Sequence, residues 1–386
     1  MQSEPNQKSS GKPWLIWIVL GIAALLVYPL LSPERSDKPR PEEPLSAPPE
    51  PLAQGTEASY KSDVIAQFRP VEEPSDGYIS SSACSECHQK EHASWHASYH
   101  RTMTQIASSD SVLGDFDKMQ FISPDGSTFL LGKSGDEHWV EITDHPELGQ
   151  TADDKAMRFP IVLTTGSHHA QEYWFATGRG RSLGLLPTVY LTHEERWVPR
   201  EAALVNPPGI AHPLSFSQWN QICNTCHTTD PRARWDSESE TYDTKVSEFG
   251  IACEACHGPA EAHVKFQRER KNLGGADLSD TPDPIVNPSS LDHRKSTQVC
   301  GACHVEHETF DPQGKFINYL PGTDYHKARH PLRLSHNGKD DEELLDRFWP
   351  DGTIRFGGRE YNGLLDSTCH TKGEMSCLSC HQMHQS

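Results

Sequence analysis

The sequence predicts an α+β fold, with a core of short helices and loops and a β-rich segment inserted into it. Three observations predict this fold. The motif Cys-x-x-Cys-His occurs five times, runs of β-forming residues alternate with turn residues between positions 119 and 191, and only 35% of the 386 residues are hydrophobic. This proportion of apolar side chains is too small to fill the interior of a chain of this size. We therefore expect attached cofactors to occupy part of the interior.

The cysteines carry the chemistry of this chain. Of the 11 cysteines, ten form five pairs separated by two residues, and each pair is followed directly by a histidine. The five sets are Cys84, Cys87 and His88; Cys223, Cys226 and His227; Cys253, Cys256 and His257; Cys300, Cys303 and His304; and Cys377, Cys380 and His381. This spacing is the attachment signature of c-type haem. The thiols bind the two vinyl groups and the histidine ligates the iron, so we predict five covalent haem c groups.

Other uses of paired cysteines fit this pattern less well. Structural zinc sites combine two Cys-x-x-Cys pairs or mixed Cys/His sets, and five pairs cannot be combined two by two. A thioredoxin-like redox site has one such pair in a domain. Cys369 is left over, and we expect it to be a free, buried thiol.

The first 31 residues predict a cytoplasmic tail and a transmembrane signal anchor. Residues 14–31 contain no charge, and at 1.5 Å per residue they span about 27 Å, enough to cross a hydrocarbon core. A cleaved signal peptide is the alternative, but its apolar region is shorter and ends at a small-x-small site. Residues 28–33 offer no such site.

Residues 32–77 predict a flexible linker, because they are rich in proline and poor in large apolar residues. The haem domain, residues 78–386, then lies on the periplasmic or extracellular side, where haem c is attached. With 54 acidic against 35 basic residues, the net charge of −19 argues against a nucleic-acid partner. We expect the membrane, through the N-terminal helix, and redox proteins as partners.

The β-rich insert covers about residues 110–205, between the first and second motifs. Its strand-like runs are separated by turn residues such as Pro124-Asp125-Gly126 and Gly135-Asp136. We expect an antiparallel sheet with strands at 119–122, 128–132, 139–142, 159–164, 172–177 and 188–191. Helices are predicted at the first motif, at 254–273 and at 340–349.

Each haem iron needs a second axial ligand, and histidine there produces low-spin iron suited to electron transfer. The chain has 22 histidines, of which five belong to the motifs. A histidine close behind a motif reaches a neighbouring haem more easily than its own, which favours His100, His263 and His384. His370, seven residues before Cys377, is a fourth candidate. For the fifth position His169 or His168 comes first, then His330.

Several segments resemble the cytochrome c-552/c-554 family. They are the first motif with Trp95, Ser98 and His100; Trp219-Asn220; the third motif with Gly258-Pro259 and His263; and Gly373-Glu374-Met375-Ser376 before the last motif. The resemblance spans about residues 78–386. It implies closely stacked haems, mostly with two histidine ligands, and it also supports the choice of axial histidines. Haem packing in that family is similar to that of hydroxylamine oxidoreductase and pentahaem nitrite reductase.

The sequence therefore favours an electron carrier over an enzyme. The alternative is a multihaem oxidoreductase that acts on nitrite, hydroxylamine or tetrathionate at one five-coordinate haem, with His168, His169, Arg179 or Arg181 near a small-molecule substrate. Pentahaem nitrite reductase has Cys-x-x-Cys-Lys at its active haem, whereas all five motifs here end in histidine. A structural subunit of a larger complex is a third hypothesis.

Overall fold

The computed structural model describes residues 65–123, 125–145, 156–203, 219–272, 282–307, 319–334, 344 and 347–384. All of them belong to the second of the two units into which the chain divides, Glu50–Ser386. The predicted anchor and most of the predicted linker lie outside these residues. Within the described residues, no helix is long and apolar enough to cross a membrane.

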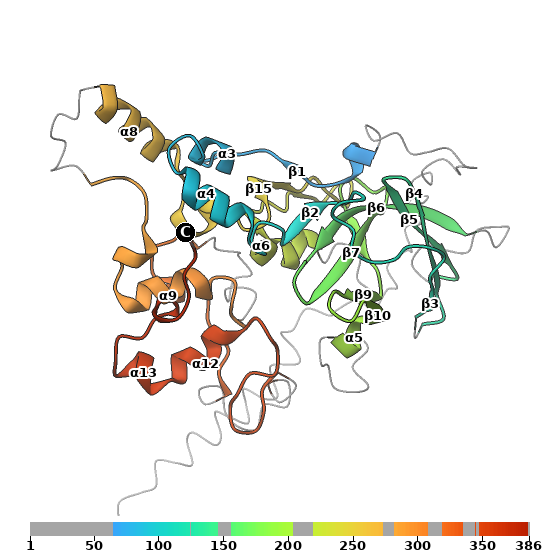
Figure 1. The fold of residues 1–386 in the computed structure, drawn as a ribbon. Helices are drawn as coiled ribbons and strands as arrows, with labels where there is room; N and C mark the ends of the chain where they lie inside the picture. The colour runs from blue at the N-terminus through green and yellow to red at the C-terminus, as the bar shows by residue number, and fades with distance from the viewer. Residues whose placement is uncertain are drawn as a thin grey trace, which may run out of the picture. The chain divides into compact units, whose positions relative to one another are not determined.

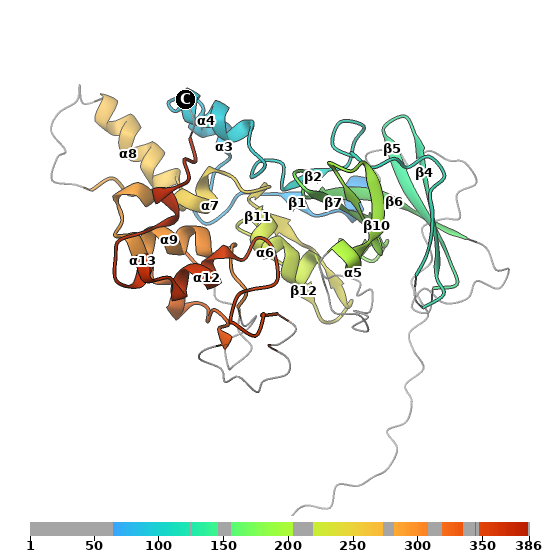
Figure 2. The same ribbon diagram turned by 60° about the horizontal axis from the view of Figure 1, so that its bottom comes forward.

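The β-rich insert forms a nine-stranded sheet. Its strands β4 to β7 lie side by side in both Figure 1 and Figure 2. Seven strands follow the order β10-β9-β7-β6-β5-β4-β3, while β2 pairs with β6 and β8 pairs with β7, and every pairing is antiparallel. The strands are β2 Thr104–Ile106, β3 Gln120–Ile122, β4 Thr128–Ser134, β5 Glu137–Thr143, β6 Met157–Thr165, β7 Ala170–Ala176, β8 Leu183–Leu185, β9 Thr188–Leu191 and β10 Arg196–Pro199. All six predicted strands are confirmed within a few residues.

Alternation along the strands explains the core of this sheet. In β5 the side chains of His138, Val140 and Ile142 are buried, while the residues between them are partly exposed. Because successive side chains point to opposite faces, a strand with this pattern buries one face. The buried face packs in a cluster with Phe129 on β4 and Phe175 on β7.

A second apolar cluster connects the sheet to the segment that carries the second motif. Trp174 of β7 and Leu183 of β8 pack there with Trp219, which is fully buried. Trp219 begins a short π-helix, Trp219–Cys223, that leads directly into α6, Asn224–His227. The insert therefore supports the second motif by packing against the turn that precedes it.

Most of the helices lie on the other side of the described unit, away from the outer strands of the sheet (Figure 1). They are α3 Ser81–Cys84, α4 Gln89–His96, α5 Arg200–Ala203, α6, α7 Cys253–His257, α8 Glu261–Asn272, α9 His293–Gly301, α12 Glu360–Asp366 and α13 Thr368–Thr371. Short 3₁₀ turns span Ala66–Phe68, Pro288–Ser290, Tyr325–Lys327 and Cys377–Ser379. Three small two-stranded sheets are also described. They pair β1 Val71–Glu72 with β14 Lys245–Val246, β11 Thr228–Thr229 with β15 Glu248–Phe249, and β12 Trp235–Asp236 with β13 Thr241–Tyr242.

The helix predicted at 254–273 is two helices. α7 ends at His257 and α8 begins at Glu261, with Gly258 between them at φ +79°. Only glycine adopts that conformation easily, and the following Pro259 disfavours a continuous helix. The break changes the direction of the chain behind the third motif. Most of the helix predicted at 340–349 lies outside the described residues.

Buried hydrogen bonds join the first and third motif segments. Trp95 of α4 donates from Nε1 to the carbonyl of Ile251, 2.7 Å away. Glu254, inside the third motif and 1% exposed, accepts from the backbone N–H groups of Ile79 and Ala260, each at 2.9 Å. Burial raises the pKa of Glu254 to about 7. The contacts from Trp95 to Ile251 and from Ile79 to Glu254 each join residues more than 150 positions apart and hold the two attachment turns side by side.

The buried carboxyl of Glu254 predicts that the protein loses stability as the pH rises. Its folded-state pKa of about 7 lies above the ordinary value of 4.5. Between these values the folded chain holds a proton that the unfolded chain has released, so the free energy of unfolding falls from about pH 4.5 to above pH 7, by at most roughly 3 kcal/mol. Urea unfolding across this range should show a flatter profile for Glu254→Gln. Glu248, whose pKa burial also raises, retains a smaller slope of the same sign. An identical slope in both proteins would contradict the assignment.

Candidate functional site

Each of the five motifs folds into a single turn. The N–H of the motif histidine donates to the carbonyl of the first cysteine in three of them: His88 to Cys84 at 2.9 Å, His304 to Cys300 at 3.0 Å, and His381 to Cys377 at 3.0 Å. The third motif forms α7, and the second spans the last residue of the π-helix, Cys223, and α6. Residues three and four apart share one face of such a turn. Both thiols and the imidazole of each motif can therefore reach one cofactor.

The attachment turns lie close to one another. The thiols of Cys84 and Cys253 lie close enough to shift each other's pKa, as do those of Cys226 and Cys303 and those of Cys300 and Cys377. Within the described part of the chain, which includes all the cysteines, each thiol is free of disulfide bonds. Ten thiols are thus available for thioether bonds, and they bring the first site beside the third, and the fourth beside the second and the fifth.

Three motif histidines each face a second histidine from a distant segment. Ring centroids lie 6.2 Å apart for His88 and His263, 6.2 Å for His257 and His384, and 6.3 Å for His100 and His304. A metal–imidazole bond is about 2 Å long and the ring centre lies about 1.1 Å behind its nitrogen, so two imidazoles on opposite faces of one metal have centroids roughly 6.2 Å apart. The residues therefore fit a metal held between each pair.

The other ring nitrogens of several of these histidines have acceptors. Nδ1 of His263 lies 2.6 Å from an Asp283 carboxylate oxygen, and Nδ1 of His257 lies 2.7 Å from the Val286 carbonyl. Nδ1 of His304 lies 3.0 Å from Glu360, and this contact lowers the pKa of Glu360 to about 2. Such partners place the proton on Nδ1, orient the ring and leave Nε2 for a metal.

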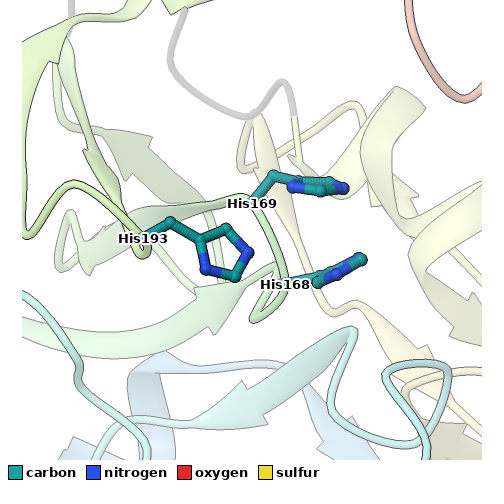
Figure 3. A group of neighbouring side chains, drawn as sticks. All are labelled: His168, His169 and His193. Carbon is teal, nitrogen blue, oxygen red and sulfur yellow. The ribbon is translucent and has the colours of Figure 1, made fainter.

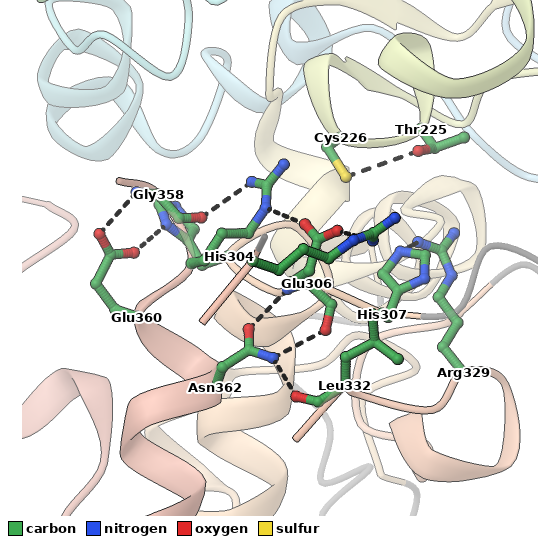
Figure 4. A network of polar contacts seen from close by, with 12 residues as sticks. Thr225, Cys226, His304, Glu306, His307, Arg329, Leu332, Gly358, Glu360 and Asn362 are labelled. Carbon is green, nitrogen blue, oxygen red and sulfur yellow. Dashed lines mark hydrogen bonds and ion pairs between the residues drawn. The ribbon is translucent and has the colours of Figure 1, made fainter. Parts of the chain in front are cut away.

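A polar network holds the segment that follows His304 (Figure 4). Glu306 accepts from Arg359 at 3.2 Å and also pairs with Arg347. Asn362 of α12 accepts from the Glu306 N–H at 2.7 Å and donates to the carbonyls of Glu306 and Leu332, both at 2.8 Å. Since α12 also contains Glu360, the network fixes the position of the carboxylate that orients His304.

In the described part of the chain, the other histidines that the sequence predicts as axial ligands do not lie beside a motif histidine. His370 is buried, with Nδ1 2.8 Å from the Met375 carbonyl, and its ring contacts His293 at 5.2 Å. His169 contacts His168 and His193, and His330 is exposed. Among the described residues, no ring contact joins these histidines to a motif histidine. Their placement adds no support to an axial role, which stays a prediction.

His227 and His381 have no facing histidine within the described part of the chain, in contrast to the other three motif histidines. Nδ1 of His227 is buried, with no hydrogen-bond partner there.

The surroundings of Cys369 and Arg181 differ from those that the sequence predicts. Cys369 is a free thiol as predicted, but it is exposed, so the predicted burial is wrong. Arg181, considered as a substrate contact, pairs with Asp243 at 3.0 Å and donates to the carbonyls of Ala66 and Arg69. These contacts make Arg181 a structural link between the insert and the residues that precede the first motif.

Sequence reasoning missed the carboxylates that orient the ligands. Asp283 lies 20 residues from His263, and Glu360 lies 56 residues from His304. No local pattern marks either residue among the 54 acidic residues of the chain. Only the folded arrangement identifies them.

Comparison with known proteins shows that one segment of the chain is similar to a protein family. Residues 207–258, which contain the second and third motifs, match the family Cytochrome c554 and c-prime. No curated protein sequence matches the chain significantly. This match and the motifs support a multihaem c-type cytochrome, a class whose general activity is electron transfer.

A solved structure, described as Outer Cell Wall Cytochrome OcwA, is also similar. It aligns with 79% of this chain at 19% sequence identity and a TM-score of 0.47, and the alignment covers 56% of its own length. The chain thus spans little more than half of that protein, and a likeness this distant carries no argument about function.

Proposed function

We propose that the chain is an electron relay with five covalently bound haem c groups. The observation that carries the proposal is the set of three histidine pairs, His88 with His263, His257 with His384, and His100 with His304, spaced at 6.2 to 6.3 Å. Haem c supplies an iron that takes up and releases one electron. Two imidazole ligands keep such an iron low-spin in both oxidation states, so that little rearrangement accompanies electron transfer.

Hydrogen-bond partners orient the histidine rings at these sites. Asp283 accepts a hydrogen bond from the Nδ1–H group of His263, and Glu360 accepts one from the Nδ1–H group of His304. The Nε2 atom of each ring is then the one that can ligate iron. A carboxylate in this position raises the basicity of the imidazole and favours the oxidised metal. The Val286 carbonyl, which lies 2.7 Å from His257, is neutral. We expect its effect to be weaker, so the three sites should differ in reduction potential.

Contacts between attachment turns support a continuous path. The thiol pairs connect the first site with the third, and the fourth site with the second and the fifth. Cys256 of the third site is close enough to Cys300 and Cys303 of the fourth to affect both electrostatically. All five sites are thereby connected, and an electron that enters at one site can reach every other.

We also propose that the haem domain lies outside the cytoplasm and is tethered by residues 14–31, with redox proteins as its partners. The attachment chemistry supports this side of the membrane, and the uncharged run supports the tether. The acidic surface implied by a net charge of −19 favours a basic partner.

A haem count combined with electron paramagnetic resonance tests the relay. We expect the mass of the mature oxidised protein to include five haems, and at least three haems per chain to give low-spin signals. A chain with fewer than five covalent haems, or with high-spin iron at the three paired sites, would contradict the proposal. Reduced protein should also transfer electrons to a small redox protein without added substrate.

A second candidate function is reduction or oxidation of a small nitrogen or sulfur compound at the second site. It is favoured by His227, which has no facing histidine among the described residues. Glu172, which pairs with Arg200 at 2.6 Å, is close enough to affect both Cys223 and His227 electrostatically, and Arg200 affects Cys223. One high-spin haem per chain, and turnover of nitrite, hydroxylamine or tetrathionate that is lost in Arg200→Ala, would establish it. A spectrum of five low-spin haems would exclude an open site.

A further inference from the structure

Three exposed histidines outside the motif turns converge on one edge of the sheet. His168 and His169 lie in the turn between β6 and β7, and His193 lies in the turn between β9 and β10. β7 and β9 are neighbours, with Ala170 opposite Leu191. The two turns therefore meet, and Figure 3 shows the three imidazoles around a common point.

The geometry of this cluster suits a single ion. One ring nitrogen from each of the three residues lies within 4.8 Å of the others. Ligand nitrogens on a tetrahedral zinc with bonds of about 2.05 Å are roughly 3.3 Å apart. The three side chains are exposed, so small rotations of His169 and His193 can close this difference while the His168 ring stays stacked on Tyr99. The required movement is on the order of an ångström.

The backbone around the cluster is already ordered. The N–H of Thr192 donates to the His169 carbonyl at 3.0 Å, and the Thr192 hydroxyl donates to the carbonyl of His168. The His168 ring stacks on Tyr99, with centroids 4.0 Å apart and planes 14° apart. These contacts fix the turns and one ring, which lowers the entropy lost when an ion binds.

The chemistry of the cluster favours a borderline transition metal. Neutral imidazoles bind Zn²⁺, Ni²⁺ and Cu²⁺ well, whereas Mg²⁺ and Ca²⁺ prefer oxygen. Glu194 and Glu195 follow His193 in the same exposed turn and add negative charge beside the cluster.

We propose that His168, His169 and His193 form a binding site for a divalent transition-metal ion, with Zn²⁺ as the representative occupant. Three protein ligands leave a fourth position for water or for a donor from another molecule. The site uses no residue of the five motifs and none of the three histidine pairs that carry the proposed relay, so it does not depend on that proposal.

Calorimetric titration of Zn²⁺ into the oxidised, haem-loaded, chelator-treated protein tests the site. His168→Ala and His193→Ala should each weaken one binding event by at least about tenfold, because each removes one of three ligands. The matched control is His96→Ala on α4, since His96 is an exposed histidine that stacks on His92 at 5.9 Å. That control should leave the event unchanged.

X-ray absorption at the zinc edge supplies a second measurement. We expect three imidazole ligands in the native protein and fewer in either cluster variant, while circular dichroism and the haem spectrum stay constant. Equal Zn²⁺ affinity in native and cluster variants, or equal weakening by the His96 control, would overturn the proposal. His169→Gln provides a third variant if one of the alanine variants fails to fold.

Discussion

Replacement of His263 by alanine is expected to convert one haem per chain from low-spin to high-spin iron. His263 is the second histidine beside His88, with centroids 6.2 Å apart. Its ring is held by Asp283 and extends from α8, whose described residues include none that are buried. Under the proposed relay the substitution would remove one axial ligand and leave the attachment cysteines of the first motif in place, so we expect the fold to persist. Electron paramagnetic resonance of the oxidised protein measures the change directly.

The matched control for this experiment is Lys265→Ala, which removes an exposed side chain from the same helix. It should leave all signals low-spin. Asp283→Asn should also stay low-spin but raise the reduction potential of that haem, because a neutral amide accepts the Nδ1 proton less strongly than a carboxylate. Low-spin iron at every site in His263→Ala would mean that another group ligates the first haem. His384→Ala and His100→Ala extend the same test to the third and fourth sites.

The sequence was most informative where one short pattern determines both structure and chemistry. Runs of β-forming residues separated by turn residues predicted the strands of the insert well, because this local chemistry determines where a strand begins and ends. The motif spacing predicted the attachment turns, since cysteines and histidine must share one face. His100, His263 and His384 each lie beside the histidine of a motif other than the nearest one in sequence, and their role as axial ligands stays a prediction.

What the sequence did not predict depends on contacts between distant segments. Asp283 and Glu360 are ordinary acidic residues until the fold places them at His263 and His304. The cluster of His168, His169 and His193 was missed for the same reason, because the two turns meet only through the pairing of β7 with β9. His169 was instead considered as an axial ligand. The sequence alone cannot tell an axial haem ligand from a member of this cluster, because both need a ring nitrogen free to bind a metal. Only the position of the histidine in the folded chain distinguishes them.

Replacement of Asn220 by alanine is expected to destabilise the haem domain by about 3 kcal/mol or more. Asn220 is fully buried, accepts from the N–H of Leu183 at 3.1 Å, and donates to the Arg181 carbonyl at 2.9 Å and the Thr244 hydroxyl at 2.8 Å. These bonds join the sheet and the β14 segment to the turn before the second motif. Alanine would leave buried polar groups without partners, at a cost of about 1–3 kcal/mol for each group. The urea midpoint of the haem-loaded protein measures the loss.

Two neighbouring substitutions separate this effect from a general sensitivity of the turn. Asn220→Asp keeps the size of the side chain but places a carboxylate oxygen against the Arg181 carbonyl, so it should destabilise to a similar degree. Ile222→Ala removes a side chain that is 45% exposed in the same turn, and it should cost less than about 1 kcal/mol. If Asn220→Ala proved as mild as Ile222→Ala, the hydrogen bonds of Asn220 would not be what holds the second attachment turn to the sheet. Packing of the fully buried Trp219 would then be the stronger of the two attachments.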